Sequence, residues 1–90
     1  MDADGVIALL KQQADSERAE HAYGFFKAFK GGYGEGDEFL GIRVPPQRKI
    51  AKANRNLPLN EVEILLQNPY HEVRLTALYL LVYRIEKADD

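Results

Sequence analysis

The 90-residue chain contains no cysteine and no tryptophan. Without cysteine it has no disulfide and no thiolate metal ligand, and it suits a reducing compartment. No run approaches the roughly 20 apolar residues that a membrane-spanning helix needs. Residues 1–10 contain two acidic residues and no basic residue, unlike the start of a secretory signal. We therefore expect a cytoplasmic protein that makes no contact with a membrane.

Size and composition indicate a small folded unit. Hydrophobic residues make up 46% of the chain and charged residues 29%, which is ordinary for a globular protein and argues against general disorder. The length falls below the roughly 100–150 residues that are most common for one domain. The chain is therefore one domain at most, or part of one.

Acidic residues are absent between Phe39 and Asn60, although the whole chain carries a net charge of −2. That segment holds five of the 12 basic residues, so the other seven basic and 14 acidic residues leave −7 on the remainder. A basic segment in an acidic chain is a candidate contact for an anion, and a solvated helix face is the commoner alternative. The five basic residues are Arg43, Arg48, Lys49, Lys52 and Arg55.

The sequence shows no catalytic or metal-binding constellation. His21 and His71 lie far apart and have no cluster of Asp, Glu or His beside them, which favours a local structural role over metal ligation. Glu61 and Glu63 are typical helix-start acids that complement the helix dipole, rather than a pair for acid–base chemistry. Ser16 is interpreted as a helix cap. We therefore predict no metal site and no catalytic residue in this chain.

The first part of the chain is predicted to form two helices. Apolar spacing predicts one helix over Gly5–Asp15 and a second that begins at Asp15 or Ser16. The second helix runs to Lys30 and ends at the glycine-rich segment Gly31–Glu38. Because this segment has neither a P-loop lysine nor a G-x-G-x-x-G pattern, we interpret it as a mobile connection and not as a phosphate-binding loop.

A third helix opens at Pro45 and Pro46 and runs to about Asn54. Proline suits the first turn of a helix, where its missing N–H has no helical partner to lose. The helical repeat then places Arg48, Lys52 and Arg55, at i, i+4 and i+7, on one face.

Two further helices complete the prediction of five helices and no sheet. Asn60 as N-cap and Glu63 at the third helical position resemble a capping box for a helix over Glu61–Gln67. Asn68-Pro69 ends that helix. The fifth and longest helix then runs from about Tyr70 to Lys87.

The fifth helix is apolar nearly all round, which is typical of a helix that is buried on several sides. Its broadest stripe contains Leu75, Leu78 and Val82, and other apolar residues lie opposite or beside this stripe. One short preceding helix cannot cover both sides. We therefore predict a contact with something outside the chain. The contact is expected to be centred on Leu80 and Tyr83 and to include Val73 and Ala77.

The helix pair Leu59–Gln67 and Tyr70–Lys87, joined by a two-residue turn, resembles a HEAT-type repeat. The order of several segments is more specific and resembles the DNA alkylation repair family, the AlkD-like DNA glycosylases. The resemblance covers roughly Asp15 to Asp90. Its segments are Phe39–Pro45, Arg48–Lys52, Glu61–Leu66, Asn68-Pro69, His71–Arg74, Tyr83 and Glu86–Asp89.

This resemblance implies an all-α solenoid, in which stacked helix pairs form a concave, basic surface that cradles duplex DNA. Members of the family excise N3- and N7-alkylated purines by hydrolysing the N-glycosidic bond, without a metal or other cofactor. Their catalytic aspartate lies beside tryptophans downstream of the region matched here. Because this chain has no tryptophan, we assign no catalytic role to Asp89 or Asp90. We expect the N-terminal part of a longer enzyme, catalytically inactive on its own.

The resemblance also implies that some of the five clustered cations contact DNA phosphates, which give affinity without reading sequence. Arg74 and Arg84 are further candidates, because the second helix of such a repeat faces the concave side. Arg74 has an alternative role, since an arginine here often ties neighbouring repeats together by hydrogen bonds.

We expect residues 1–56 to form N-terminal helices that include the glycine-rich loop 31–38, and residues 57–88 to form one HEAT-like helix pair. The expected partners are duplex DNA and either further repeats of the parent protein or a second copy of the chain. The alternative function is a HEAT-like scaffold that binds a protein partner.

Overall fold

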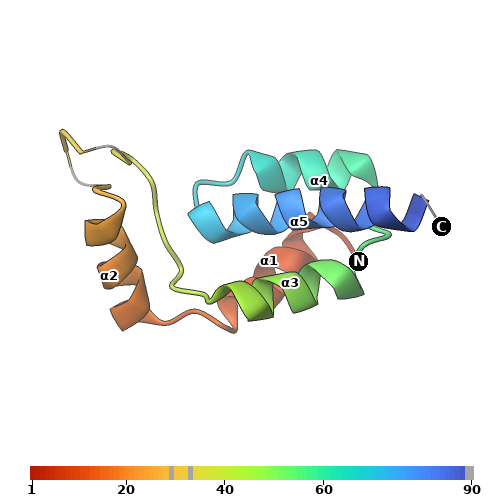
Figure 1. The fold of residues 1–90 in the computed structure, drawn as a ribbon, viewed down its shortest axis with the longest axis horizontal. Coiled ribbons are helices and arrows are strands. Elements are labelled where there is room, and N and C mark those ends of the chain that lie inside the picture. Colours follow the sequence, from red (N-terminus) through yellow and green to blue (C-terminus); the bar gives the residue numbers. More distant parts are fainter. Residues whose placement is uncertain (29, 33, 89–90) are drawn as a thin grey trace.

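The computed structural model describes the chain except Phe29, Tyr33, Asp89 and Asp90, and gives only the backbone of Lys87 and Ala88. The described residues form helices and no strand; Glu38 and Tyr70 make one isolated β-bridge. None of these helices has the length and apolar character needed to cross a membrane. The all-α prediction is confirmed. The helices are α1 (Ala3–Lys11), α2 (Ser16–Phe25), α3 (Val44–Ala53), α4 (Leu59–Leu66) and α5 (His71–Ala88) (Figure 1).

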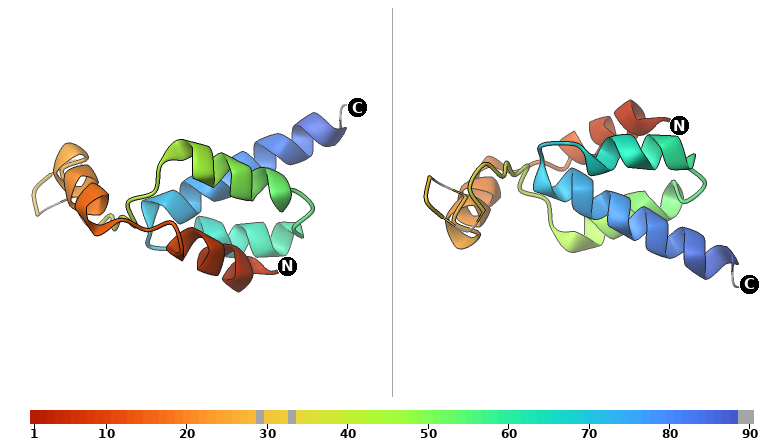
Figure 2. Two further views of the ribbon diagram at one scale, coloured as in Figure 1. Left: turned by 90° about the horizontal axis from the view of Figure 1, so that it is seen from below. Right: turned by 90° about the horizontal axis from the view of Figure 1, so that it is seen from above.

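Four of the helices form two layers. Helices α1 and α3 make one layer and α4 and α5 the other, as the views from below and above show (Figure 2). Between the layers α1 packs on α4 and α3 packs on α5. Two stacked helix pairs are the arrangement expected of a helical-repeat protein. Helix α2 stands apart from the four (Figure 1).

The first two helices each begin with an aspartate cap. The Asp2 carboxylate accepts a hydrogen bond from the Gly5 N–H at 2.8 Å, and Asp15 accepts one from the Arg18 N–H at 3.1 Å. Such caps satisfy N–H groups that the helix itself leaves without partners. Because Asp2 caps α1, that helix starts before the predicted Gly5, and it ends at Lys11 instead of Asp15.

Helix α2 is shorter than predicted and ends at Phe25 instead of Lys30. Beyond it, Lys27 has a φ of 52°, and its carbonyl accepts a hydrogen bond from the Gly34 N–H at 3.0 Å. The glycine-rich segment therefore folds back against the end of the helix. No side chain within α2 is buried, so the packing energy that would hold a longer regular helix is small.

The predicted capping box of α4 is wrong. The helix begins at Leu59 after Pro58, and no side chain caps it, so Asn60 lies inside the first turn. Glu61 has a different role, since its carboxylate accepts a hydrogen bond from the Ala3 N–H at 2.9 Å. The first turn of α4 is thereby joined to the first turn of α1.

The core lies between the two layers, and α5 contributes its central row. Val73, Ala77 and Leu80 are each 0% exposed and pack in a cluster with residues such as Leu10 and Leu65. The prediction that an outside partner contacts these three residues is therefore wrong. The physical reason is that α5 packs on both α3 and α4, so two helices cover it instead of one. Tyr83, the fourth predicted contact residue, is half-buried beside this core.

A different side of α5 is exposed. Leu78, Val82 and Ile85 are 50%, 47% and 64% exposed and follow the helical spacing i, i+4 and i+7. We call these three residues the outer apolar stripe. On the neighbouring helix α4, Ile64 is also 50% exposed. Leu78 and Val82 belong to the broadest apolar stripe of the fifth helix, which we expected the chain itself to cover. The structure instead leaves this part of the stripe exposed.

Candidate nucleic-acid interface

The clustered cations lie on α3 or close to its two ends. Arg43 is the N-cap residue, and the first turn contains Pro45 and Pro46 as predicted. Arg48 and Lys52 are exposed and Arg55 is half-exposed, one helical turn or less apart along the chain. We call Arg48, Lys52 and Arg55 the basic face. Arg48 and Lys52 lie one turn apart on α3, and Arg55 follows the C-cap residue Asn54, just beyond the end of the helix.

Three cations also surround one shallow groove at the C-terminal end of α3. The groove has a volume of about 420 Å³ and is lined by Lys49, Lys52 and Arg55 together with Ala53 and Asn56. Cations near a helix C-terminus are favoured by the helix dipole. The same arrangement gives an incoming anion three positive partners and no acidic one within the lining.

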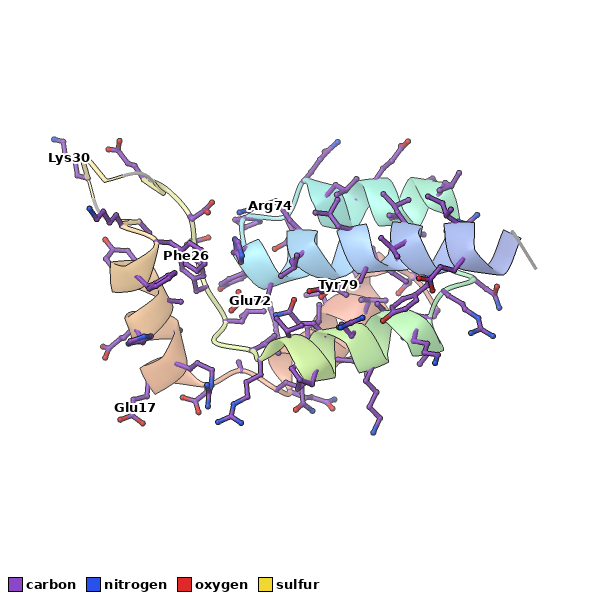
Figure 3. All side chains as sticks on the ribbon, viewed as in Figure 1. Glu17, Phe26, Lys30, Glu72, Arg74 and Tyr79 are labelled. Atoms are coloured by element: carbon purple, nitrogen blue, oxygen red, sulfur yellow. The ribbon has the colours of Figure 1, made fainter. Side chains whose placement is uncertain are left out.

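Arg48 is held at the seam between α3 and α5. Its Nε donates a hydrogen bond to the Tyr83 hydroxyl at 3.3 Å, and its Cζ lies 5.7 Å from the centre of the Tyr79 ring. Figure 3 shows Tyr79 on the side of α5 that faces α3. The hydrogen bond to Tyr83 raises the pKa of Arg48 above its ordinary value. The guanidinium is therefore charged and restrained by a cation–π contact while it remains exposed.

The two arginines of α5 are engaged inside the chain. Arg74 donates to the carbonyl groups of Asn68 and Pro69 at 2.8 and 2.9 Å and to the Asp37 carboxylate at 2.8 Å. Arg84 donates to the Leu57 carbonyl at 2.7 Å. Arg74 thus joins the start of α5 to the turn before it and to the glycine-rich segment, and Arg84 joins α5 to the segment before α4.

A family model described as "DNA alkylation repair enzyme" matches residues 6–90. The chain belongs to the DNA alkylation repair enzyme family. The match contains most of α1 and all of α2–α5, and it contains the basic face. No curated protein and no solved structure matches the chain.

Two features of this DNA alkylation repair family member were missed in the sequence. The Glu72 carboxylate is buried, 4% exposed, and accepts hydrogen bonds from the backbone between α2 and α3. Gln47 is buried too, and its Nε2 donates to the Ile42 carbonyl at 3.0 Å. The only local signal was the position of an acid in the first turn of a helix, which alone suggests no more than a favourable dipole contact.

An aromatic cluster holds the end of α2 against the start of α5. The Phe26 ring stacks on Phe39 with 5.4 Å between ring centres, and the His71 ring lies 5.1 and 5.2 Å from these two. Figure 3 shows Phe26 on the side of α2 that faces α5. His71 thus packs at the start of its helix, and its Nδ1 is 3.9 Å from the Asp37 carboxylate. This contact explains its position without a metal ligand.

Proposed function

We propose that the chain is the DNA-binding part of a DNA alkylation repair glycosylase and that α3 contacts the backbone of duplex DNA. The observation that carries this proposal is the basic face of α3, in a chain whose net charge is −2 and whose family repairs alkylated DNA. Four of the five cations are exposed and Arg55 is half-exposed. Arg48 donates to the Tyr83 hydroxyl, whereas Arg74 and Arg84 are half-exposed and donate to backbone carbonyl groups, Arg74 also to the Asp37 carboxylate. Arg43, Arg48, Lys49, Lys52 and Arg55 are therefore the proposed phosphate contacts.

The spacing of the basic face suits a phosphate backbone. Arg48 and Lys52 lie about 6 Å apart along the axis of α3, close to two base-pair steps of 3.4 Å along the duplex axis. Phosphate contacts need positive charge and reach but no match to a base sequence. Arg48, which Tyr79 and Tyr83 restrain, loses less freedom on binding than an unrestrained arginine would.

For the whole enzyme we propose removal of N3- or N7-alkylated purines by hydrolysis of the N-glycosidic bond. This step follows from family membership and from no residue of the described structure. The chain has no tryptophan to place beside a catalytic aspartate. We accordingly propose that these 90 residues bind DNA but release no alkylated base.

We expect weak, sequence-independent binding of duplex DNA that falls as salt rises. The reason is the release of counterions from each neutralised phosphate, which lowers log K by about 0.9 per tenfold rise in salt for every contact. Fluorescence anisotropy with labelled duplexes of two unrelated sequences, titrated at several salt concentrations, measures both properties. Binding that is absent, or that does not respond to salt, would contradict the proposal. Base release from methylated DNA would contradict the proposal that this chain is catalytically inactive.

The outer apolar stripe favours a second candidate function, the docking of protein. Apolar surface left in water forfeits roughly 25 cal/mol per Å², and contiguous exposed apolar patches are typical of interaction sites. In a helical-repeat protein a further helix pair covers such a face. In the isolated chain a second copy is the proposed occupant.

We therefore expect the isolated chain to self-associate, and Leu78→Glu to weaken that association at least tenfold by burying a charge in the contact. Sedimentation velocity over a wide concentration range measures the mass. Phe25→Glu is the matched control, because Phe25 is also exposed but lies on α2, away from the stripe. A wild-type chain that stays monomeric at high concentration would contradict this candidate, and so would an equal effect of both substitutions.

A further inference from the structure

The backbone that enters α3 is bound by one buried carboxylate. Glu72 accepts hydrogen bonds from three consecutive N–H groups, those of Leu40 at 2.9 Å, Gly41 at 2.8 Å and Ile42 at 3.2 Å. The residues are separated by 30 or more positions in the sequence. Figure 3 shows Glu72 at the start of α5, beside the segment of chain that leads into α3.

The hydrogen bonds to Glu72 are strong because one charged carboxylate accepts from three backbone N–H dipoles. Hydrogen bonds to an ionised carboxylate are shorter and stronger than those between neutral groups. Glu72 also lies in the first turn of α5, where the helix dipole favours a negative charge. A buried carboxylate with this many donors is compensated, whereas a shorter or neutral side chain would leave buried N–H groups without a partner.

The other polar groups of the same segment are fixed by neighbouring elements. The Leu40 carbonyl accepts from the Asp15 N–H at 2.9 Å, at the start of α2. The Ile42 carbonyl accepts from the buried amide of Gln47 at 3.0 Å, inside α3. Residues 40–42 are therefore a junction that is hydrogen-bonded to α2, α3 and α5. Among the hydrogen bonds named here, those from α5 all involve Glu72.

We propose that Glu72 is a positioning residue for the DNA-binding face. Arg43 follows the junction directly and is the N-cap of α3, so the placement of residues 40–42 determines where Arg43 and the first turn of α3 lie. Glu72 touches no DNA in this proposal and acts through Arg43. The proposal rests on the proposed function, because it assigns α3 to the DNA backbone.

The test is the variant Glu72→Gln, which keeps the shape of the side chain but removes the charge and one acceptor oxygen. We expect duplex affinity at low salt to fall roughly threefold to tenfold and the salt slope to shrink by about 0.9, the share of one phosphate contact. Because Arg43 supplies that contact, Glu72→Gln should cause no further loss in an Arg43→Gln background. Anisotropy titrations of all three variants measure these quantities under conditions where each is folded.

Val62→Ala is the control for lost stability alone. Val62 is buried in α4 and takes part in none of the hydrogen bonds that hold residues 40–42, so its truncation destabilises the fold but leaves those bonds in place. The proposal predicts a normal salt slope for this variant. Equal changes in slope for Val62→Ala and Glu72→Gln would overturn it, as would an unchanged slope in Glu72→Gln.

Amide hydrogen exchange separates this proposal from the proposed function. Faster exchange at residues 40–42 in Glu72→Gln, with wild-type binding of duplex DNA intact, supports the positioning role. Unchanged exchange overturns the role of Glu72 and leaves DNA binding by α3 standing. A wild-type chain that binds no duplex overturns the proposed function, and the positioning role with it, whatever the exchange rates are.

Discussion

Replacing Arg48, Lys52 and Arg55 together by glutamine is expected to lower duplex affinity roughly a hundredfold at low salt. Each lost phosphate contact removes about 0.9 from the slope of log K against log salt, so three lost contacts reduce the slope by about 2.7. The loss should be equal for unrelated duplex sequences, because phosphate contacts carry no sequence information. Anisotropy titrations over a range of salt concentrations measure both the affinity and the slope.

A charge-matched control distinguishes the basic face from net charge. Lys11, Arg18 and Lys30 are exposed cations outside the basic segment, and their joint replacement by glutamine changes the net charge by the same amount. At about 0.1 M salt, charges farther from the DNA than the Debye length of roughly 10 Å are screened, so this control should lose less than about threefold in affinity under that condition. Equal losses in the two triple variants would assign binding to overall charge. Unchanged affinity in the first variant would remove α3 from the interface.

Local features of the sequence predicted the number of helices and the start of α3, because two prolines suit the first turn of a helix. The helical spacing of Arg48 and Lys52 holds in the structure, but the helix ends at Ala53, so helix geometry does not place Arg55 on the same face. The end of α2 was harder to predict. Phe26 continues the apolar spacing of that helix, but it packs on Phe39 and His71 beyond the last turn.

The buried side of α5 could not be predicted from periodicity. The helix carries apolar residues on every side, so its own pattern does not distinguish Leu80 from Val82. The choice depends on tertiary contacts, since α3 and α4 together cover the side with Leu80 and leave Val82 exposed. A helix whose pattern is strongly one-sided would not have this ambiguity.

In the candidate site, too, features set by neighbouring residues could be predicted, and contacts between residues far apart in the sequence could not. Spacing alone placed Arg48 and Lys52 one turn apart on a helix, but it could not show that Arg84 donates to the Leu57 carbonyl, 27 positions away. The role of Glu72 likewise requires a backbone segment 30 or more positions earlier, bent so that consecutive N–H groups point at one carboxylate. Neither contact produces a repeating pattern in the sequence from which it could be predicted.

The substitution Gly41→Ala is expected to cost roughly 3–5 kcal/mol of the free energy of unfolding, a large effect for a single residue. Gly41 has a φ of 81°, in the left-handed region that side chains disfavour. A Cβ there would also collide with the Asp15 carbonyl oxygen and lie 2.7 Å from the Ala19 nitrogen. Because Glu72 binds the Gly41 N–H at 2.8 Å, the segment cannot move away without losing that bond.

Substitutions at two other glycines distinguish the steric clash at Gly41 from the cost of its backbone conformation. Gly36 has a φ of 89°, but a Cβ added there would meet no atom within 4 Å, so Gly36→Ala should cost only about 1–2 kcal/mol. Gly24 lies inside α2 in open space, and Gly24→Ala should stabilise the chain by roughly 0.5–1 kcal/mol through helix propensity. Urea unfolding followed by circular dichroism measures all three. The free energy of unfolding of a chain of this length is roughly 5–13 kcal/mol. Gly41→Ala should therefore unfold at a markedly lower urea concentration. An effect no larger than that of Gly36→Ala would show that the start of α2 yields to the added methyl group and that residues 40–42 are not a fixed junction.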